Sequence, residues 1–125
     1  MKIKIYYHHT DAGGVVYYAT YLKFLEEART ELLEQRGVSV KGLAQEGVLF
    51  VVTRQEIDYK FPAFYGDVLQ IDTRLTKVRG ARIEFEYEIK NHNQQIVVTA
   101  KTTLGCVDKN LKPKIIPEEI RKLIS

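Results

Sequence analysis

The 125-residue sequence contains one cysteine and two serines, and these shortages exclude several kinds of chemistry. Because Cys106 has no second cysteine to pair with, no internal disulfide can form, which fits a reducing cytoplasm. Neither Ser39 nor Ser125 lies in a nucleophile elbow, and the chain has no phosphate-binding glycine loop and no dinucleotide fingerprint. One cysteine and three histidines disfavour a zinc site. His8 and His9 are adjacent on a segment that we expect to be extended, with their side chains on opposite faces.

Long apolar runs are also missing. No stretch of 18 apolar residues occurs, and residues 1–11 lack the apolar core of a signal peptide, so we expect a soluble, cytoplasmic protein. The net charge of +3 is mild, and the basic residues are scattered among acidic ones. This distribution argues against a nucleic-acid-binding face and leaves room for an anionic ligand. The length allows one hydrophobic core, and we expect residues 1–125 to form a single domain.

The N-terminal third reads as a strand, a glycine-containing turn and a long helix. Residues 2–8 alternate between polar and apolar, with Tyr7 on the apolar side, which predicts a half-buried strand. Residues 18–36 repeat apolar side chains at helical spacing until Gly37, which predicts the only long helix. Its apolar stripe, wide enough to pack against a sheet, consists of Tyr21, Leu22, Phe24, Leu25, Ala28, Leu32 and Leu33.

Four strand candidates follow in a row, at residues 49–61, 66–78, 82–90 and 95–108, and a short helix at 118–124 closes the chain after Pro117. The order predicts an α+β domain in which a curved, antiparallel five-stranded sheet wraps around one long helix. In the first of the four strands, alternation puts one set of side chains on one face: Val51, Thr53, Gln55, Ile57, Tyr59 and Phe61. One helix covers only one face of the sheet, so we expect a second subunit at an edge strand or at the other face.

The turn "TDAGGVVY" offers the most specific chemistry in the chain. Asp11 precedes a helix start, where several backbone N–H groups lack partners, and Gly13 and Gly14 let a ligand approach the backbone. A carboxylate beside free N–H donors suits acyl-transfer hydrolysis, which needs a base or nucleophile together with an oxyanion site. The alternative is purely local, since Asp11 can simply bond its own turn or cap the helix. The spacing of the residues leaves both interpretations open.

The run "YYHHTDAGGVVYYATYLKFLEEARTELL" resembles the opening of the 4-hydroxybenzoyl-CoA thioesterase family of hotdog-fold acyl-CoA thioesterases. The bacterial branch of this family includes the thioesterases associated with the Tol–Pal gene cluster. A second stretch, "IDYKFPAFYGDVLQIDTRL", is similar to the family's second and third strands, so the resemblance covers most of the chain. It implies a hotdog fold with Asp11 as general base or nucleophile. The backbone N–H of Tyr18, seven residues later, would be the oxyanion donor.

Two departures and one binding site follow from the same resemblance. The Tol–Pal branch usually has histidine where this chain has Tyr18, and it tends to be acidic where this chain has His8 and His9. Family members bind coenzyme A (CoA) phosphates with basic residues near the dimer surface. The matching candidates lie in "TKVRGAR", whose alternative role is a solvated hairpin tip; they are Lys77, Arg79 and Arg82.

The sequence-based hypothesis is therefore a homodimeric or tetrameric thioesterase that hydrolyses acyl-CoA, or the thioester of an acyl carrier protein. No metal or redox cofactor is needed, because the thioester is already reactive and the thiolate leaves readily. Tyr17, Tyr21 and Phe24 are expected in the core, with one or two of them able to line an acyl tunnel. One competing interpretation is a non-catalytic module that binds an acyl thioester. The other, a hotdog hydratase, normally needs a histidine on or near the helix, and this helix has none.

Overall fold

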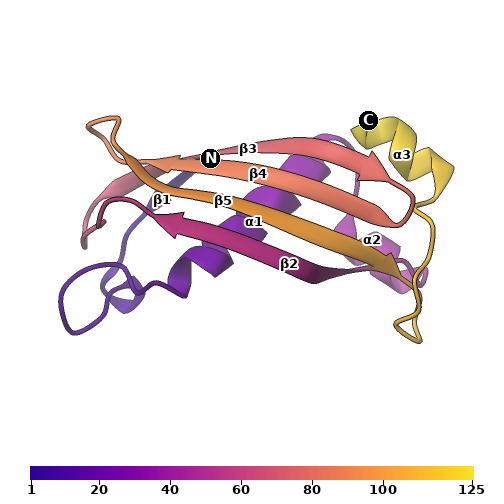
Figure 1. Cartoon of the computed structure of the whole chain (residues 1–125), viewed down its shortest axis with the longest axis horizontal. Helices are drawn as coiled ribbons and strands as arrows, with labels where there is room; N and C mark the ends of the chain where they lie inside the picture. The colour runs from indigo at the N-terminus through magenta and orange to yellow at the C-terminus, as the bar shows by residue number, and fades with distance from the viewer.

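Five antiparallel strands form one curved sheet with a long helix across one face in the computed structural model, which describes residues 1–125 (Figure 1). The strands are β1 (Lys2–Lys4), β2 (Leu49–Tyr59), β3 (Val68–Arg79), β4 (Arg82–Lys90) and β5 (Ile96–Val107). The helices are η1 (Tyr7–His9, a 3₁₀ turn), α1 (Thr20–Gln35), α2 (Val40–Gln45) and α3 (Glu118–Ile124). This arrangement confirms the predicted α+β hotdog fold. No helix combines the length and the apolar composition that crossing a bilayer requires.

The core lies between the inner face of the sheet and α1. Strand β4 shows the clearest alternation, because every second residue is buried while the glutamates between them reach the outer face. These inner side chains belong to one cluster of 25 buried residues, which also contains Leu25 and Ala28 of α1. The predicted face of β4 is therefore confirmed, and so is that of the helix except at Leu22, which was expected in the apolar stripe but is 43% exposed. The buried β4 residues are Ile83, Phe85, Tyr87 and Ile89.

The order of the strands differs from a simple meander. Strands β3, β4 and β5 follow one another as predicted, but β2 pairs with β5 and lies at the opposite edge from β1. The two edges are unlike each other. Edge β1 has three residues and exposes Lys2 and Lys4, which discourages pairing with another chain. Edge β2 has eleven residues and exposes apolar and aromatic side chains, among them Val51, Val52 and Tyr59.

A β-bulge corrects the predicted face of β2. Val52 pairs with Leu104, but the next pair joins Arg54 to Thr103, so Thr53 is the extra residue. A bulge shifts the alternation by one residue. The uninterrupted alternation had predicted that Val51 and Gln55 share a face. Val51 instead pairs with Gly105 and lies on the opposite face from Gln55.

The N-terminal segment also differs from its prediction. Strand β1 ends at Lys4, and the chain then makes the η1 turn, which leaves Tyr7 78% exposed instead of packed inward. The same turn brings the rings of His8 and His9 to 4.0 Å between centroids, so the expectation of opposite faces was wrong. The long helix begins at Thr20, two residues later than predicted.

Helix α2 was not predicted at all. Its N-terminus is capped by Ser39, whose hydroxyl accepts the Gly42 N–H at 3.0 Å. The closing helix α3 was predicted correctly, and Pro117 is its N-cap.

Candidate active site

A tight loop joins η1 to α1 and holds Asp11 at its tip. Thr10 and Val16 form an isolated antiparallel bridge, and the Asp11 N–H donates to the Val15 carbonyl at 2.9 Å. Gly14 has φ of +85°, a conformation that side-chain-bearing residues rarely adopt. Val16 in turn donates its N–H to Ala63 at 2.8 Å, which fixes the loop to the end of the sheet.

The carboxylate of Asp11 is exposed, and one of its two oxygens accepts a hydrogen bond. Its Oδ1 accepts the Gly13 N–H at 2.8 Å, so the local turn bond considered in the sequence is present. A Cβ at Gly13 would lie 3.2 Å from that same Oδ1, a tight contact that would push the carboxylate aside by a few tenths of an ångström. Oδ2 accepts no hydrogen bond within the chain. The turn bond thus fixes the orientation of the carboxylate and leaves one oxygen free.

Unpaired backbone donors lie just before α1. The N–H groups of Tyr18 and Ala19 donate to no group in the chain, although Tyr18 lies two residues outside the helix itself. The Tyr18 carbonyl accepts the Tyr59 hydroxyl at 3.0 Å, which holds the peptide group between Tyr18 and Ala19. The positive end of the α1 dipole favours negative charge at these donors.

Aromatic rings surround these donors. Tyr18 lies 4.7 Å from Tyr17 and 6.4 Å from Tyr59, and Tyr59 lies 5.7 Å from Tyr21, measured between ring centroids. Burial raises the pKa of Tyr21 to about 12. A hydrogen bond with Tyr18 raises the pKa of Tyr17, and the nearby charge of Asp11 raises it further. The Tyr17 and Tyr21 phenols are therefore neutral at pH 7 and contribute to an uncharged wall.

The expectation of a packed core holds for two of the three aromatic residues named from the sequence. Tyr21 and Phe24 are buried, whereas Tyr17 is 45% exposed.

Tyr59→Phe tests the role of the tyrosine hydroxyl. Losing the bond to the Tyr18 carbonyl should loosen the backbone at Tyr18 and Ala19 and so weaken the two unpaired N–H donors of these residues. We expect kcat for thioester hydrolysis to fall about 10-fold, with little change in KM. Tyr65→Phe, which also removes an exposed hydroxyl at this end of the molecule, is the matched control. Equal kcat values for wild type and Tyr59→Phe would remove Tyr59 from the site.

His9 connects both sides of the Asp11 loop. Its Nδ1 accepts the Tyr6 N–H at 2.9 Å, its carbonyl accepts the Tyr17 N–H at 2.9 Å, and its ring lies 5.1 Å from Phe24. Burial lowers the pKa of His9, and the nearby charges of His8 and Lys23 lower it further. The bond to Nδ1 requires the neutral ring, so protonation of His9 opposes the folded state.

The stability of the protein should depend on pH through His9. Because its pKa is lower when folded than when unfolded, the unfolded chain binds the proton first as the pH falls. The free energy of unfolding should therefore decrease below about pH 6.5 and level off below the folded-state pKa. His9→Gln should lose this component, and His92→Gln, which changes an exposed turn, should retain it. Denaturant unfolding across this pH range measures the effect, and equal slopes for His9→Gln and wild type would contradict it.

The basic residues named from the sequence lie far from Asp11 within one chain. Strand β3 begins near the loop, because the Ile5 N–H, just before η1, donates to the Asp67 carbonyl. The strand ends at Arg79, and its length at 3.3 Å per residue places Arg79 about 35 Å from that start. Lys77 pairs with Glu84 at 3.5 Å, whereas Arg79 and Arg82 face each other across the hairpin without an ion pair. The structure therefore brings Asp11 and Tyr18 to one end of the sheet and these three cations to the other.

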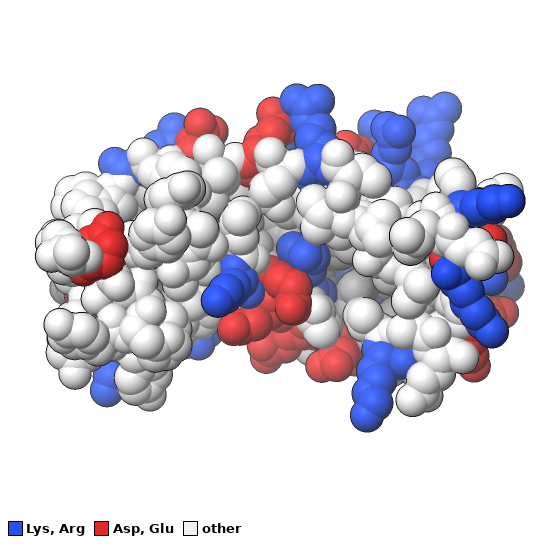
Figure 2. All heavy atoms as spheres, turned by 90° about the horizontal axis from the view of Figure 1, so that it is seen from below, with Lys and Arg blue, Asp and Glu red and all other residues white.

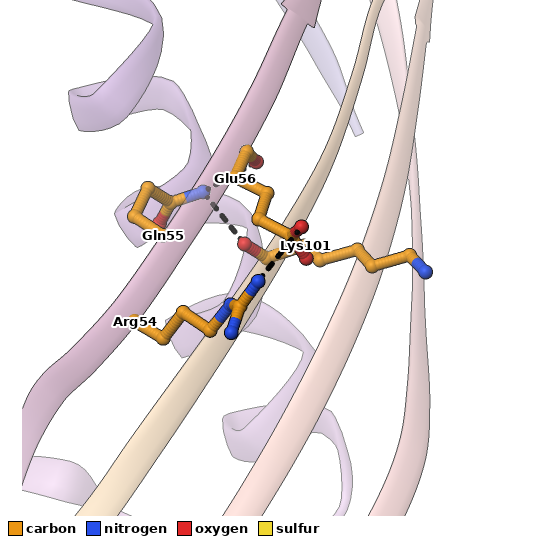
Figure 3. A network of polar contacts seen from close by, with 4 residues as sticks. All are labelled: Arg54, Gln55, Glu56 and Lys101. Carbon is orange, nitrogen blue, oxygen red and sulfur yellow. Dashed lines mark hydrogen bonds and ion pairs between the residues drawn. The ribbon is translucent and has the colours of Figure 1, made fainter.

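The outer face of the sheet contains a hollow that does not suit an acyl group. Its wall is mainly charged and includes Glu56, Asp58, Asp72, Arg74, Glu86, Glu88 and Lys101. Next to it, Arg54 pairs with Glu56 at 3.2 Å, and the Gln55 amide donates to the Lys101 carbonyl at 2.9 Å (Figure 3). Five carboxylates would also repel CoA phosphates. No group of three His, Cys, Asp or Glu side chains is arranged to hold a metal ion.

Comparison with known proteins assigns the class. The model of the Thioesterase-like superfamily matches residues 7–124, and the chain belongs to this family. It is 40% identical over 119 residues to the acyl-CoA thioester hydrolase YbgC of Escherichia coli O157:H7, covering 94% of this chain and 89% of the relative. It is 30% identical over 115 residues to the 1,4-dihydroxy-2-naphthoyl-CoA hydrolase of Synechococcus elongatus, covering 90% of this chain and 84% of that one.

A solved structure agrees with this assignment. The DHNA-CoA thioesterase of Staphylococcus aureus superposes with a TM-score of 0.89 at 28% identity, over 92% of this chain and 78% of that one. The chain is accordingly a hotdog-fold thioester hydrolase, as the sequence resemblance implied.

Two contributors to the site gave no clear signal in the sequence. In the sequence Tyr59 is one more alternating strand residue. Its hydrogen bond to the Tyr18 carbonyl becomes apparent only in the structure, where the end of β2 lies beside the start of α1. The position of β2 at the edge of the sheet was also not predictable, because the alternation of side chains does not say which strands are neighbours. Its length and apolar content were the available hints.

Proposed function

We propose that this chain hydrolyses acyl-CoA at the Asp11 loop, with the thioester oxygen on the backbone N–H of Tyr18. The observation that carries the proposal is the pair of unpaired donors, Tyr18 N–H and Ala19 N–H, at the same end of the sheet as a carboxylate with one free oxygen. The substrate class comes from the relatives, which act on acyl-CoA thioesters. The buried, unpaired thiol of Cys106 fits the cytoplasmic setting that we propose.

The chemistry needs only groups that the loop provides. The carbonyl oxygen gains negative charge as the carbon is attacked, and the Tyr18 N–H stabilises that charge. Asp11 either removes a proton from the attacking water or attacks the carbon itself to form an anhydride that water then hydrolyses. In both routes the C–S bond breaks, CoA leaves as the thiolate and takes up a proton, and the acyl group leaves as the free acid.

A second copy of the chain is proposed to complete the site. Asp11 is exposed in one chain, and Tyr18 is 61% exposed, so the site has an open side. Edge β2 runs along that side, and its free backbone groups and exposed Val51, Val52 and Tyr59 suit antiparallel pairing with another β2. Seen from this edge, much of the surface toward the loop end is uncharged (Figure 2). The homodimer is the minimum assembly, and a dimer of dimers remains compatible with it.

Pairing across β2 also gives the basic residues a role. Lys77, Arg79 and Arg82 are too distant to serve the Asp11 of their own chain, but a twofold axis brings opposite ends of the two sheets together. We therefore propose that these cations contribute to CoA binding only across the subunit interface. Either CoA or an acyl carrier protein could present the thioester.

A panel of thioesters tests the proposed activity. Aromatic, short-chain and long-chain acyl-CoAs, and one acyl carrier protein thioester, should be compared by release of free thiol. We expect turnover of at least one acyl-CoA above the rate without protein. No turnover of any member would contradict the proposal and favour a non-catalytic module that binds the thioester.

A further inference from the structure

One buried side-chain oxygen of the chain has no hydrogen-bond partner, and it is the hydroxyl of Tyr87. Tyr87 lies on the inner face of β4, is 4% exposed, and stacks beside Phe85 in the core between the sheet and α1. Buried polar groups in folded proteins are nearly always paired, so this hydroxyl needs a physical explanation. Burial raises the pKa of the phenol, which is therefore neutral at pH 7 and offers its proton to an acceptor.

Two polar side chains, Thr102 and Arg29, lie near this hydroxyl. Against the larger effect of burial, both lower the pKa of Tyr87 in part, although neither meets the geometry of a hydrogen bond to the phenol oxygen. The Thr102 hydroxyl donates its proton to Gln55 Oε1 at 2.7 Å, and the Gln55 amide nitrogen donates to two backbone carbonyls. Arg29 is half-buried on α1 and makes no hydrogen bond or ion pair with the chain.

We call Arg29, Gln55, Tyr87 and Thr102 the polar cluster. It offers several free donors and almost no free acceptor, because a guanidinium only donates and the Tyr87 hydroxyl adds another proton. A cation that is partly removed from water without a counter-charge is destabilising. The component that the cluster lacks is therefore an anion, and a carboxylate presents a planar pair of oxygens that matches the fork of a guanidinium.

The polar cluster lies beside a strip of the inner sheet face that α1 leaves uncovered. Figure 1 shows α1 crossing the sheet obliquely, from the β2 side at the loop end toward β3. On the inner face of β2, Val52 is exposed, and Gln55 and Ile57 are only half-buried. Leu22 of α1 is also exposed and lies about two turns before Arg29, on the same side of the helix. These residues form the uncovered strip between α1 and the β2 edge.

The uncovered strip connects the proposed oxyanion donor with the polar cluster. Tyr59, whose hydroxyl bonds the Tyr18 carbonyl, lies on the same face of β2 as Ile57 and Gln55. Four residue steps of strand separate Tyr59 from Gln55, or about 13 Å. An acyl chain whose carbonyl binds the Tyr18 N–H can therefore extend over the apolar Ile57 and end within reach of the long side chain of Arg29.

We propose that Arg29 binds a carboxylate at the far end of the acyl chain, so that the preferred substrate class is an ω-carboxyacyl-CoA, the half thioester of a dicarboxylic acid. This inference rests on the proposed function, which places the acyl carbonyl on the Tyr18 N–H. Tyr87 acts as a positioning residue, because its hydroxyl lies between the Arg29 guanidinium and Thr102. A chain that ends in a methyl group leaves the cation unpaired and is bound less tightly.

Matched thioesters test the proposal: adipoyl- against hexanoyl-CoA, suberoyl- against octanoyl-CoA and sebacoyl- against decanoyl-CoA. In each pair a carboxylate replaces the terminal methyl group. At the chain length that reaches Arg29, the wild type should have a KM about 10-fold lower for the carboxylated member and a similar kcat, because the carboxylate lies far from the reacting atoms.

Variants assign this preference to the polar cluster. Arg29→Gln should abolish the difference in KM within the pair, and Arg29→Lys, which keeps the charge without the fork, should retain part of it. Tyr87→Phe should reduce the difference about 3-fold without changing the ratio of the two kcat values, since its hydroxyl only positions the guanidinium. The matched control is Arg74→Gln, which removes a guanidinium from the outer face of the sheet and should keep the full preference.

Calorimetry with the corresponding CoA thioethers, which cannot be hydrolysed, separates this proposal from the proposed function. Tighter binding of the carboxylated thioether by the wild type, lost in Arg29→Gln, supports the proposal even if no thioester is turned over. Equal affinity of the wild type for both members of every pair would overturn it, as would a preference that Arg29→Gln leaves intact. Dissociation of the dimer in both Arg29 variants, measured by light scattering, would also overturn it, because the missing anion would then come from the partner subunit.

Discussion

Asp11→Asn is expected to lower kcat for acyl-CoA hydrolysis on the order of 10²-fold or more, because an amide can neither accept the proton of water nor attack the carbonyl. The substitution is close to isosteric. Its oxygen can still accept the Gly13 N–H, which lies 2.8 Å from Oδ1, so the loop should keep its conformation. Thermal unfolding should therefore be unchanged, and KM should change little.

A matched control isolates the chemical role of this carboxylate. Asp72→Asn removes another exposed acid, on the outer face of the sheet, and should retain full activity. Wild-type turnover by Asp11→Asn would show that the carboxylate only stabilises its turn. If the protein is a binding module, Asp11→Asn will bind the thioester with unchanged affinity and there will be no turnover to lose.

Val52→Lys is expected to convert the proposed dimer into monomers and to reduce activity on the order of 10²-fold, because the open side of each proposed site would lose its cover. Val52 is 50% exposed on edge β2, so a lysine there is tolerated by the isolated chain. In a paired edge, the two symmetry-related lysines would place charge in the apolar interface. Light scattering and the rate of thioester hydrolysis measure the two effects.

Leu123→Lys provides the comparison for this interface. Leu123 is 48% exposed on α3, away from the β2 edge, and the substitution introduces the same charge. We expect this variant to remain dimeric and active. A dimeric, fully active Val52→Lys would place the interface elsewhere. It would also contradict the proposed binding of CoA by basic residues across paired β2 edges.

Local patterns in the sequence predicted the elements whose structure is set locally. The alternation in β4 is complete because all its inner residues contact the same core, and the helical stripe through Leu25 and Ala28 has the same origin. The Asp11 loop was recognisable because a turn with positive φ at Gly14 requires glycine. The turn and its carboxylate were therefore identifiable from nearby residues, whereas the choice of the Tyr18 N–H came from the family resemblance, and the catalytic roles of both groups stay predictions.

Features set by distant contacts were not predictable from the same patterns. The pairing of β2 with β5 joins residues about fifty positions apart, and no periodicity records which strands are neighbours. The bulge at Thr53 reverses the faces of half a strand without a glycine or proline to mark it. The separation between Asp11 and Arg79 likewise becomes visible only when the strand is laid out in space.

A crystal structure of the Asp11→Asn variant with an intact acyl-CoA is the most direct test of where the carbonyl binds. It should show the thioester oxygen about 3 Å from the Tyr18 backbone nitrogen, with the side chain at position 11 facing the carbonyl carbon. A thioester seated elsewhere, with the N–H of Tyr18 directed to solvent, would contradict the account.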